Sequence, residues 1–258
     1  MYKLKTCFFI SICLLSSQVI AKSAPITIYA EPAGSSHPLE NITIDDFIEG
    51  VPIDSWNYSN KLYHFNSLIG KDITLLFKHD HYKTSQSGTF SISPLGYMGT
   101  HHLISWQPIS SVLWTALKYS TEVATLSKMK KGYCQVLTTV TAKNKTLDDD
   151  PQGESGAKVD LVSQDWSSPN KPYSKIFYFG ILAKKSFPVP GLTSTSADGG
   201  VLFMNVAPNH KYKIVTTKHV VNFTQPEFIC RPQLWDQLGL SETVLINISP
   251  PQGPTVID

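Results

Sequence analysis

Four histidines are the residues whose type and spacing are best suited to binding a metal ion. His79 and His81 are one residue apart in a strand-like run, so a β-strand would place both imidazoles on one face. His101 and His102 follow later, where a neighbouring strand can bring them close. Clustered imidazoles suit Cu(II), Ni(II) or Zn(II). The pattern predicts either a metal site holding Cu or Zn or a set of unrelated histidines in loops.

Two further segments carry groups that chemistry can use. The turn Asp148–Asp150, with Gln152 and Glu154, offers oxygen ligands to a hard cation but lacks the alternating carboxylates of an EF-hand loop, so a solvated acidic turn explains it. The segment 153–156, GESG, resembles a serine nucleophile loop only superficially, and turn residues alone explain it. The sequence has no H-E-x-x-H, G-x-S-x-G or phosphate-loop pattern, which favours a protein that is not an enzyme.

Aromatic side chains are the other candidates for binding. The chain has five tryptophans, and Trp166 and Trp235 lie close to turn residues. Aromatic rings exposed on a β-sandwich form flat surfaces that bind glycans or proteins, whereas rings in the core serve packing alone. We therefore expect Trp166 and Trp235 to lie at a binding surface, with ordinary packing as the alternative.

The start of the chain predicts export. Lys3 and Lys5 precede an apolar run, Cys7–Leu15, and Val19 and Ala21 occupy the small-residue positions of a cleavage site. The prediction is a signal peptide over residues 1–21 and a secreted or periplasmic protein that begins near Lys22. No later run approaches the roughly 20 apolar residues of a transmembrane helix.

Charge argues against nucleic acid as a partner. The chain has 22 Lys+Arg and 20 Asp+Glu, and loss of Lys3 and Lys5 leaves 20 against 20. Arg231 is the one arginine in the sequence. Nucleic-acid-binding domains show a basic footprint in which arginine reads bases or phosphates. A formally neutral mature chain lacks that footprint.

The cysteines predict one covalent cross-link. Cys7 and Cys13 are removed with the signal peptide, which leaves Cys134 and Cys230. Two cysteines in an exported protein favour a disulfide bond. Two unpaired buried thiols are the alternative.

The elements that must position these residues are short strands. Strand-like runs separated by Gly, Pro, Asn and Ser turns predict an all-β protein with two consecutive β-sandwich domains. The expected boundaries are an N-terminal domain over 22–127, a linker over 128–132 and a second domain over 133–258. The segment Ser110–Met129 is interpreted as a strand and connector, with a short helix as the alternative.

The stretch Leu192–Lys218 carries the clearest local pattern. The turn at Ala197–Gly200 combines an Asp with two glycines that tolerate positive φ, which predicts a hairpin turn. The run Val201–Val206 has strand-forming residues, and Tyr212, Ile214 and Thr216 then alternate with polar neighbours, as in a half-buried strand.

The segment Thr195–Pro208, with Tyr212 following it, resembles the core pattern of carboxypeptidase-regulatory-like domains: a T-x-A-D-G turn, a strand, an N-V-x-P turn and a tyrosine-bearing strand. Asn209 and His210 stand where that family usually has glycine. The resemblance covers roughly 133–250 and implies a transthyretin-like sandwich of about seven strands. It also implies a non-catalytic structural or binding module.

These observations predict an exported binding or structural module whose partner is an extracellular protein or glycan. An exported hydrolase with its site in the N-terminal domain, and a metal-binding protein that uses the histidine cluster, are the alternatives.

Overall fold

The computed structural model describes residues 23–33, 37–46, 57–97, 104–145, 149–168, 170–182, 185–240 and 243–248. The predicted signal peptide over 1–21 lies outside the described residues. Strands predominate over helices in the described chain, with 15 strands against two helices, so the prediction of an all-β protein is confirmed. Neither of the two helices in the described part is long and apolar enough to cross a membrane.

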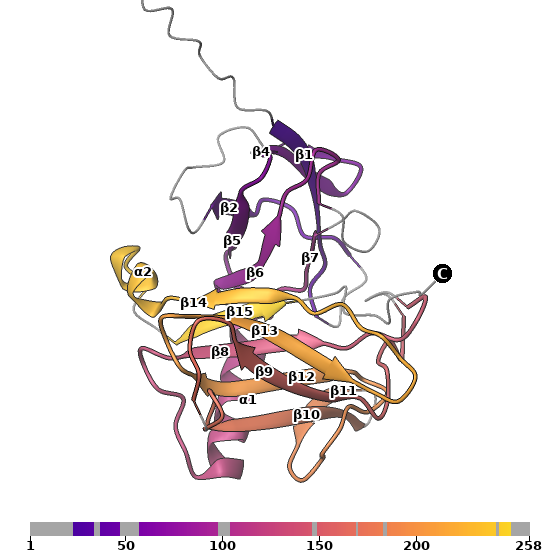
Figure 1. Cartoon of the computed structure of the whole chain (residues 1–258), viewed down its shortest axis with the longest axis vertical. Coiled ribbons are helices and arrows are strands. Elements are labelled where there is room, and N and C mark those ends of the chain that lie inside the picture. The colour runs from indigo at the N-terminus through magenta and orange to yellow at the C-terminus, as the bar shows by residue number, and fades with distance from the viewer. Residues whose placement is uncertain are drawn as a thin grey trace, which may run out of the picture.

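The first half of the chain forms two small layers (Figure 1). One is a four-stranded sheet in the order β3 (Asn57–Ser59), β4 (Leu62–Leu68), β1 (Ser23–Ala30) and β7 (Ile104–Trp106). The other contains β2 (Thr43–Asp46), β5 (Asp72–Lys78) and β6 (Ser85–Ser91). Alternating residues of β1 are buried, and Phe77 stacks on Trp106 in the core between the layers.

The second half contributes eight strands and the helix α2, and the helix α1 precedes its first strand. The strands are β8 (Cys134–Thr139), β9 (Lys158–Ser163), β10 (Lys175–Leu182), β11 (Lys185–Val189), β12 (Gly200–Val206), β13 (His210–Thr217), β14 (Glu227–Cys230) and β15 (Val244–Ile248). The helices are α1 (Ser111–Thr125) and α2 (Pro232–Gln237).

The strand β6 connects the two halves. The eleven-stranded sheet follows the path β11-β10-β12-β8-β15-β6-β14-β13-β9, and β6 also pairs with β5. In Figure 1, β6 lies where the two halves of the molecule meet. The buried Gln86 side chain donates to the Ile229 carbonyl at 2.7 Å. The backbone therefore runs as one hydrogen-bonded sheet through both halves, and the domain boundaries inferred from the sequence stay a prediction.

The segment Ser110–Met129 contains the helix α1, so the alternative of a short helix is confirmed and the preferred interpretation as a strand was wrong. Ser110 begins α1 as an N-cap, since its Oγ accepts from the Leu113 N–H at 3.1 Å. Trp114 and Leu117 of α1 pack against Phe179 and Leu202 of the neighbouring sheet. Burial of that helix face outweighs the weak helix propensity of its Ser, Thr and Val residues.

The predicted linker contains exposed lysines but is tied to the sheet. Asn205, in a β-bulge of β12, accepts from the Lys130 N–H at 2.8 Å and donates to the Lys128 carbonyl at 3.1 Å. Met129 between them is buried. The charged side chains thus reach solvent while the backbone is fixed.

The turn before β12 has the predicted backbone conformation but is not a hairpin. Gly199 has φ of +79°, and Asp198 Oδ1 accepts from the Gly200 N–H at 2.9 Å. However, β11, the strand before this turn, pairs with β10, and β12 pairs with β10 and β8. The expected hairpin is wrong because the turn joins two strands that are not paired with each other. After β12 the chain crosses to β13, which pairs with β14 and β9. Tyr212 fixes the crossing into β13 by donating to the Ala207 carbonyl at 2.9 Å.

Candidate functional site

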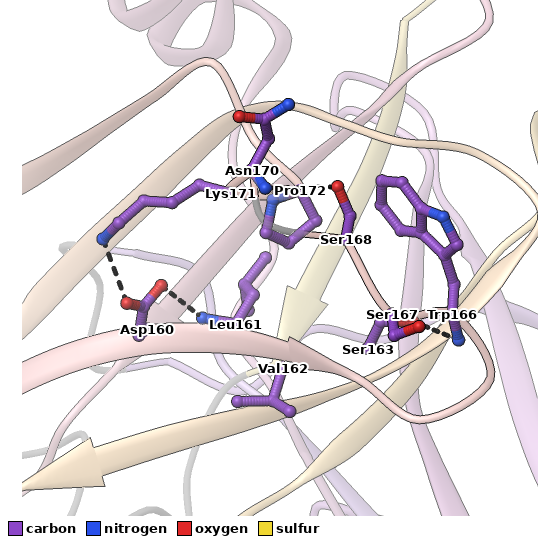
Figure 2. Close-up of a pocket in the computed structure, with 10 residues that line it drawn as sticks. All are labelled: Asp160, Leu161, Val162, Ser163, Trp166, Ser167, Ser168, Asn170, Lys171 and Pro172. Atoms are coloured by element: carbon purple, nitrogen blue, oxygen red, sulfur yellow. Dashed lines mark hydrogen bonds and ion pairs between the residues drawn. The ribbon is translucent and has the colours of Figure 1, made fainter.

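The candidate site is an open groove beside the edge strand β9. It has a volume of about 610 Å³ and lies between β9 and the segment that leads to β10 (Figure 2). We call it the Trp166 groove; its lining residues are Asp160, Leu161, Val162, Ser163, Trp166, Ser167, Ser168, Asn170, Lys171 and Pro172. A single run of chain, from β9 to the start of β10, therefore supplies the whole lining.

Asp160 closes one end of the groove. Its Oδ1 accepts from the Tyr173 hydroxyl at 2.6 Å and from the Leu161 N–H at 2.9 Å, and its Oδ2 accepts from Lys171 Nζ at 3.0 Å. Lys171 Nζ also donates to the Tyr173 hydroxyl at 2.8 Å. These bonds fasten the segment after the groove to the strand before it, so its shape is set before any ligand arrives.

The same bonds fix the charges at that end. Partial burial opposes ionisation of Asp160, but the hydrogen bonds from Tyr173, Lys171 and Leu161 outweigh it and lower the pKa of the carboxyl. Hydrogen bonds to Tyr173 and Asp160 raise the pKa of Lys171, and burial raises the pKa of Tyr173 to about 12. At neutral pH the end of the groove therefore holds a carboxylate, an ammonium and a neutral phenol.

Trp166 forms the opposite wall. Its ring is 38% exposed and stacks on the His210 imidazole, with centroids 4.8 Å apart and planes 12° apart. The backbone N–H of Trp166 donates to Ser163 Oγ at 3.1 Å. Asp165 supports the stack, since it bonds to His210 Nδ1 and to the Lys211 N–H, each at 3.1 Å. One ring face is thus covered by His210, and the indole presents the rest of its surface to the groove.

Of the two tryptophans predicted at a surface, one is exposed and the other is not. Trp166 lines the groove. Trp235 is 1% exposed, so its place at a surface was wrong. Pro232 begins the short helix α2, and this helix directs the Trp235 side chain into the core. The indole Nε1–H of Trp235 donates to Gln86 Oε1 at 3.4 Å. Trp235 therefore packs against the strand shared by the two halves.

The histidine cluster is described only in part. His79 and His81 lie in the turn between β5 and β6 rather than in a strand, because β5 ends at Lys78 and His81 has φ of +70°. The expectation that both face one side of a sheet was therefore wrong. His101 and His102 lie outside the described residues. The described residues contain no group of three or more His, Cys, Asp or Glu suited to a metal, and the four-histidine site stays a prediction.

The predicted disulfide is confirmed. Cys134 at the start of β8 is bonded to Cys230 at the end of β14, across a sequence separation of 96. Since β15 and β6 lie between β8 and β14 on the sheet path, the bond joins two strands that are not hydrogen-bonded neighbours.

Sequence reasoning missed Asp160, Lys171 and Tyr173. Their mutual hydrogen bonds depend on the return of the chain from β9 to β10, and no sequence spacing signals it. The detectable signal was Trp166 among Ser, Pro and Asn residues, which marked an exposed aromatic ring in a loop.

Comparison with known proteins gives no family. No family model and no curated protein match the sequence. Among solved structures, a streptococcal ancillary pilin is similar with 9% identity, a TM-score of 0.29, and coverage of 90% of this chain and 69% of the pilin. The major pilin T-13 of Streptococcus pyogenes is similar with 12% identity, a TM-score of 0.18, and coverage of 79% of this chain and 84% of the pilin.

Proposed function

We propose that this chain is an exported binding module that holds an extracellular ligand in the Trp166 groove without catalysing a reaction. The observation that carries the proposal is Trp166, a large aromatic ring left partly exposed yet held in one orientation by His210. A preoriented ring loses little conformational freedom on binding and offers a large contact area. Such a ring in the wall of a groove is suited to recognition.

The charges of the groove also favour recognition over catalysis. A general acid or base works best when its pKa lies near the working pH. Here the pKa of Asp160 is lowered and the pKa of Lys171 is raised, so both move away from neutrality. The Asp160–Lys171 pair therefore fixes the shape of the groove and can serve as a donor and acceptor to a ligand.

Export is supported by two independent features. The N-terminal residues have the pattern of a signal peptide, and Cys134–Cys230 is a disulfide bond, which persists in oxidising compartments. The resemblance of Thr195–Pro208 to carboxypeptidase-regulatory-like domains supports a non-catalytic module further.

The experiment compares the wild-type protein with Trp166→Ala and Tyr119→Ala on panels of immobilised extracellular-matrix proteins and glycans. Tyr119 is an exposed aromatic residue of α1 that does not line the groove, so it controls for general loss of aromatic surface. We expect the wild type and Tyr119→Ala to bind the same target, and Trp166→Ala to lose it. Equal binding by all three proteins would contradict the assignment of the groove.

A further inference from the structure

The chemistry of the Trp166 groove narrows its ligand class. Among its lining residues, one cation, Lys171, and one anion, Asp160, are paired with each other at 3.0 Å. The lining thus has no net charge to attract a strongly charged ligand. The remaining polar groups are the hydroxyls of Ser163, Ser167 and Ser168 and the amide of Asn170. Charge balance therefore favours an uncharged, polar ligand.

A polypeptide that extends the sheet at β9 does not fit this edge. Gln164 N–H donates to the Lys211 carbonyl and Ile214 N–H to the Pro226 carbonyl, each at 2.9 Å, so the peptide groups of Val159 and Leu161 point away from β13. Side chains bond to the Val159 N–H and carbonyl and to the Leu161 N–H. Strand addition requires a row of unpaired backbone groups.

Side chains occupy this outer edge of β9. The Tyr178 hydroxyl accepts from the Val159 N–H at 3.1 Å and donates to the Val159 carbonyl at 3.3 Å. The Leu161 N–H donates to Asp160 Oδ1. The Lys171–Asp160 and Tyr173–Asp160 bonds then close the end of the groove across the path of an added strand. The groove admits a compact ligand from solvent more readily than an extended chain.

The polar side chains beside Trp166 are both donors and acceptors. Figure 2 shows Ser168 between Asn170 and Trp166, and Ser168 Oγ accepts from the Asn170 N–H at 3.2 Å. That bond leaves the Ser168 hydroxyl proton free to donate, while the side-chain amide of Asn170 offers two N–H donors and a carbonyl acceptor. Sugar hydroxyls are likewise donors and acceptors, and the C–H groups of a pyranose ring form an apolar face that packs on an indole.

We propose that the Trp166 groove binds an uncharged pyranose unit of a glycan. One face of the sugar ring packs on Trp166, and its hydroxyls bond to Ser168, Asn170 and Lys171. This inference rests on the proposed function and names its ligand class. Because neither partner contributes net charge, the affinity should change little between about 0.05 and 0.5 M salt, where screening of exposed charges changes strongly.

The test uses a glycan array that carries terminal galactose, glucose, mannose, N-acetylhexosamines and sialic acid, with a parallel panel of extracellular-matrix proteins. The proteins are the wild type, Trp166→Ala, Trp166→Phe, Asn170→Ala and the control Tyr119→Ala, each checked for an unchanged melting temperature. Trp166 is the one exposed tryptophan in the described part of the chain, so a fluorescence change on sugar addition that is lost in Trp166→Phe reports binding at the groove.

We expect the wild type and Tyr119→Ala to bind an uncharged sugar equally. Affinity should fall at least about tenfold in Trp166→Ala and less in Trp166→Phe and Asn170→Ala. Binding to a matrix protein alone, lost in Trp166→Ala, would overturn the saccharide and keep the binding module. A sialylated glycan as the one ligand would also overturn the uncharged sugar. Binding unaffected by Trp166→Ala, or no binding on either panel, would overturn both proposals.

Discussion

Substitutions at two glycines with the same backbone conformation can distinguish two causes of lost stability. One is the positive φ, and the other is the close approach of a neighbouring backbone. Gly199 has φ of +79° and Gly191 has φ of +87°. A Cβ on Gly191 would meet nothing within 4 Å. A Cβ on Gly199 would lie 2.4 Å from the Val140 carbonyl oxygen and 2.8 Å from Gly153 Cα. The substitutions Gly191→Ala and Gly199→Ala therefore differ mainly in contacts.

The expected magnitudes follow from these distances. The left-handed conformation costs a non-glycine residue about 1–2 kcal/mol, and both variants incur it. Real Cβ contacts stay above 3.0 Å, so Gly199→Ala must also move backbone by at least 3.0 − 2.4 = 0.6 Å. Displacement in a packed region adds about 1–3 kcal/mol. For a protein of this size, that excess lowers the melting temperature by roughly 2–12 °C relative to Gly191→Ala.

Thermal denaturation of the oxidised protein, followed by circular dichroism, measures both variants against the wild type. Urea midpoints provide an independent value of the free energy of unfolding. The Gly199→Ala variant should melt clearly below Gly191→Ala. Equal melting temperatures would refute the close approach of Gly199 to Val140, and a lower value for Gly191→Ala would refute the reasoning altogether.

Three further predictions concern the tryptophans, the groove and the histidines. Trp235→Ala should lower the free energy of unfolding by about 3–5 kcal/mol, because Trp235 is buried against Gln86, whereas Trp166→Ala should lower it by less than about 1 kcal/mol. Similar urea midpoints for the two variants would contradict the burial of Trp235. The pKa of Asp160 is lower in the folded state, so its ionised carboxylate stabilises the fold above the unfolded pKa, and this contribution is lost as pH falls through the folded pKa. Below about pH 4 the wild type should therefore lose melting temperature faster than Asp160→Asn. Parallel changes of melting temperature with pH in the two proteins would contradict the lowered pKa. The four-histidine hypothesis predicts one Cu(II) per chain, bound more tightly than Zn(II) and released below about pH 6; calorimetry showing equal uptake by wild type and His79→Ala/His81→Ala would eliminate the site.

Local chemistry predicted the features that depend on neighbouring residues. The all-β class followed from short runs between turn residues, and the disulfide followed from two cysteines in a chain predicted to be exported. Positive φ at Gly199 followed from its place after Asp198. Each of these depends on a few adjacent residues or on a residue count, so sequence alone is sufficient.

The errors concern long-range packing. The helix α1 was hard to recognise because apolar side chains occupy its exposed face, including Val112, Tyr119 and Val123, as well as its buried face, so the pattern has little contrast. Ser110, with its cap bond to Leu113, was the missed signal. Turn chemistry before β12 could not show which strand the chain would pair with next.

Of the residues that line the candidate site, the sequence predicted one, Trp166. Trp166 stood out as an aromatic residue among turn formers, but the same reasoning misplaced Trp235, whose neighbour Pro232 starts a helix instead of a loop. The Asp160–Lys171–Tyr173 contacts arise only when the chain folds back from β9 toward β10, two strands that are far apart on the sheet path.

The shared strand β6 has a consequence for how this protein responds to mechanical load and to proteases. Because β6 pairs with β5 on one side and with β14 and β15 on the other, a pull on either half is transmitted through backbone hydrogen bonds to the other. A protease cut within Lys128–Lys131 would sever the chain, yet Gln86 and Asn205 would still hold the fragments together. A chain built this way is expected to resist shear and proteolytic nicking better than two domains joined by a free linker.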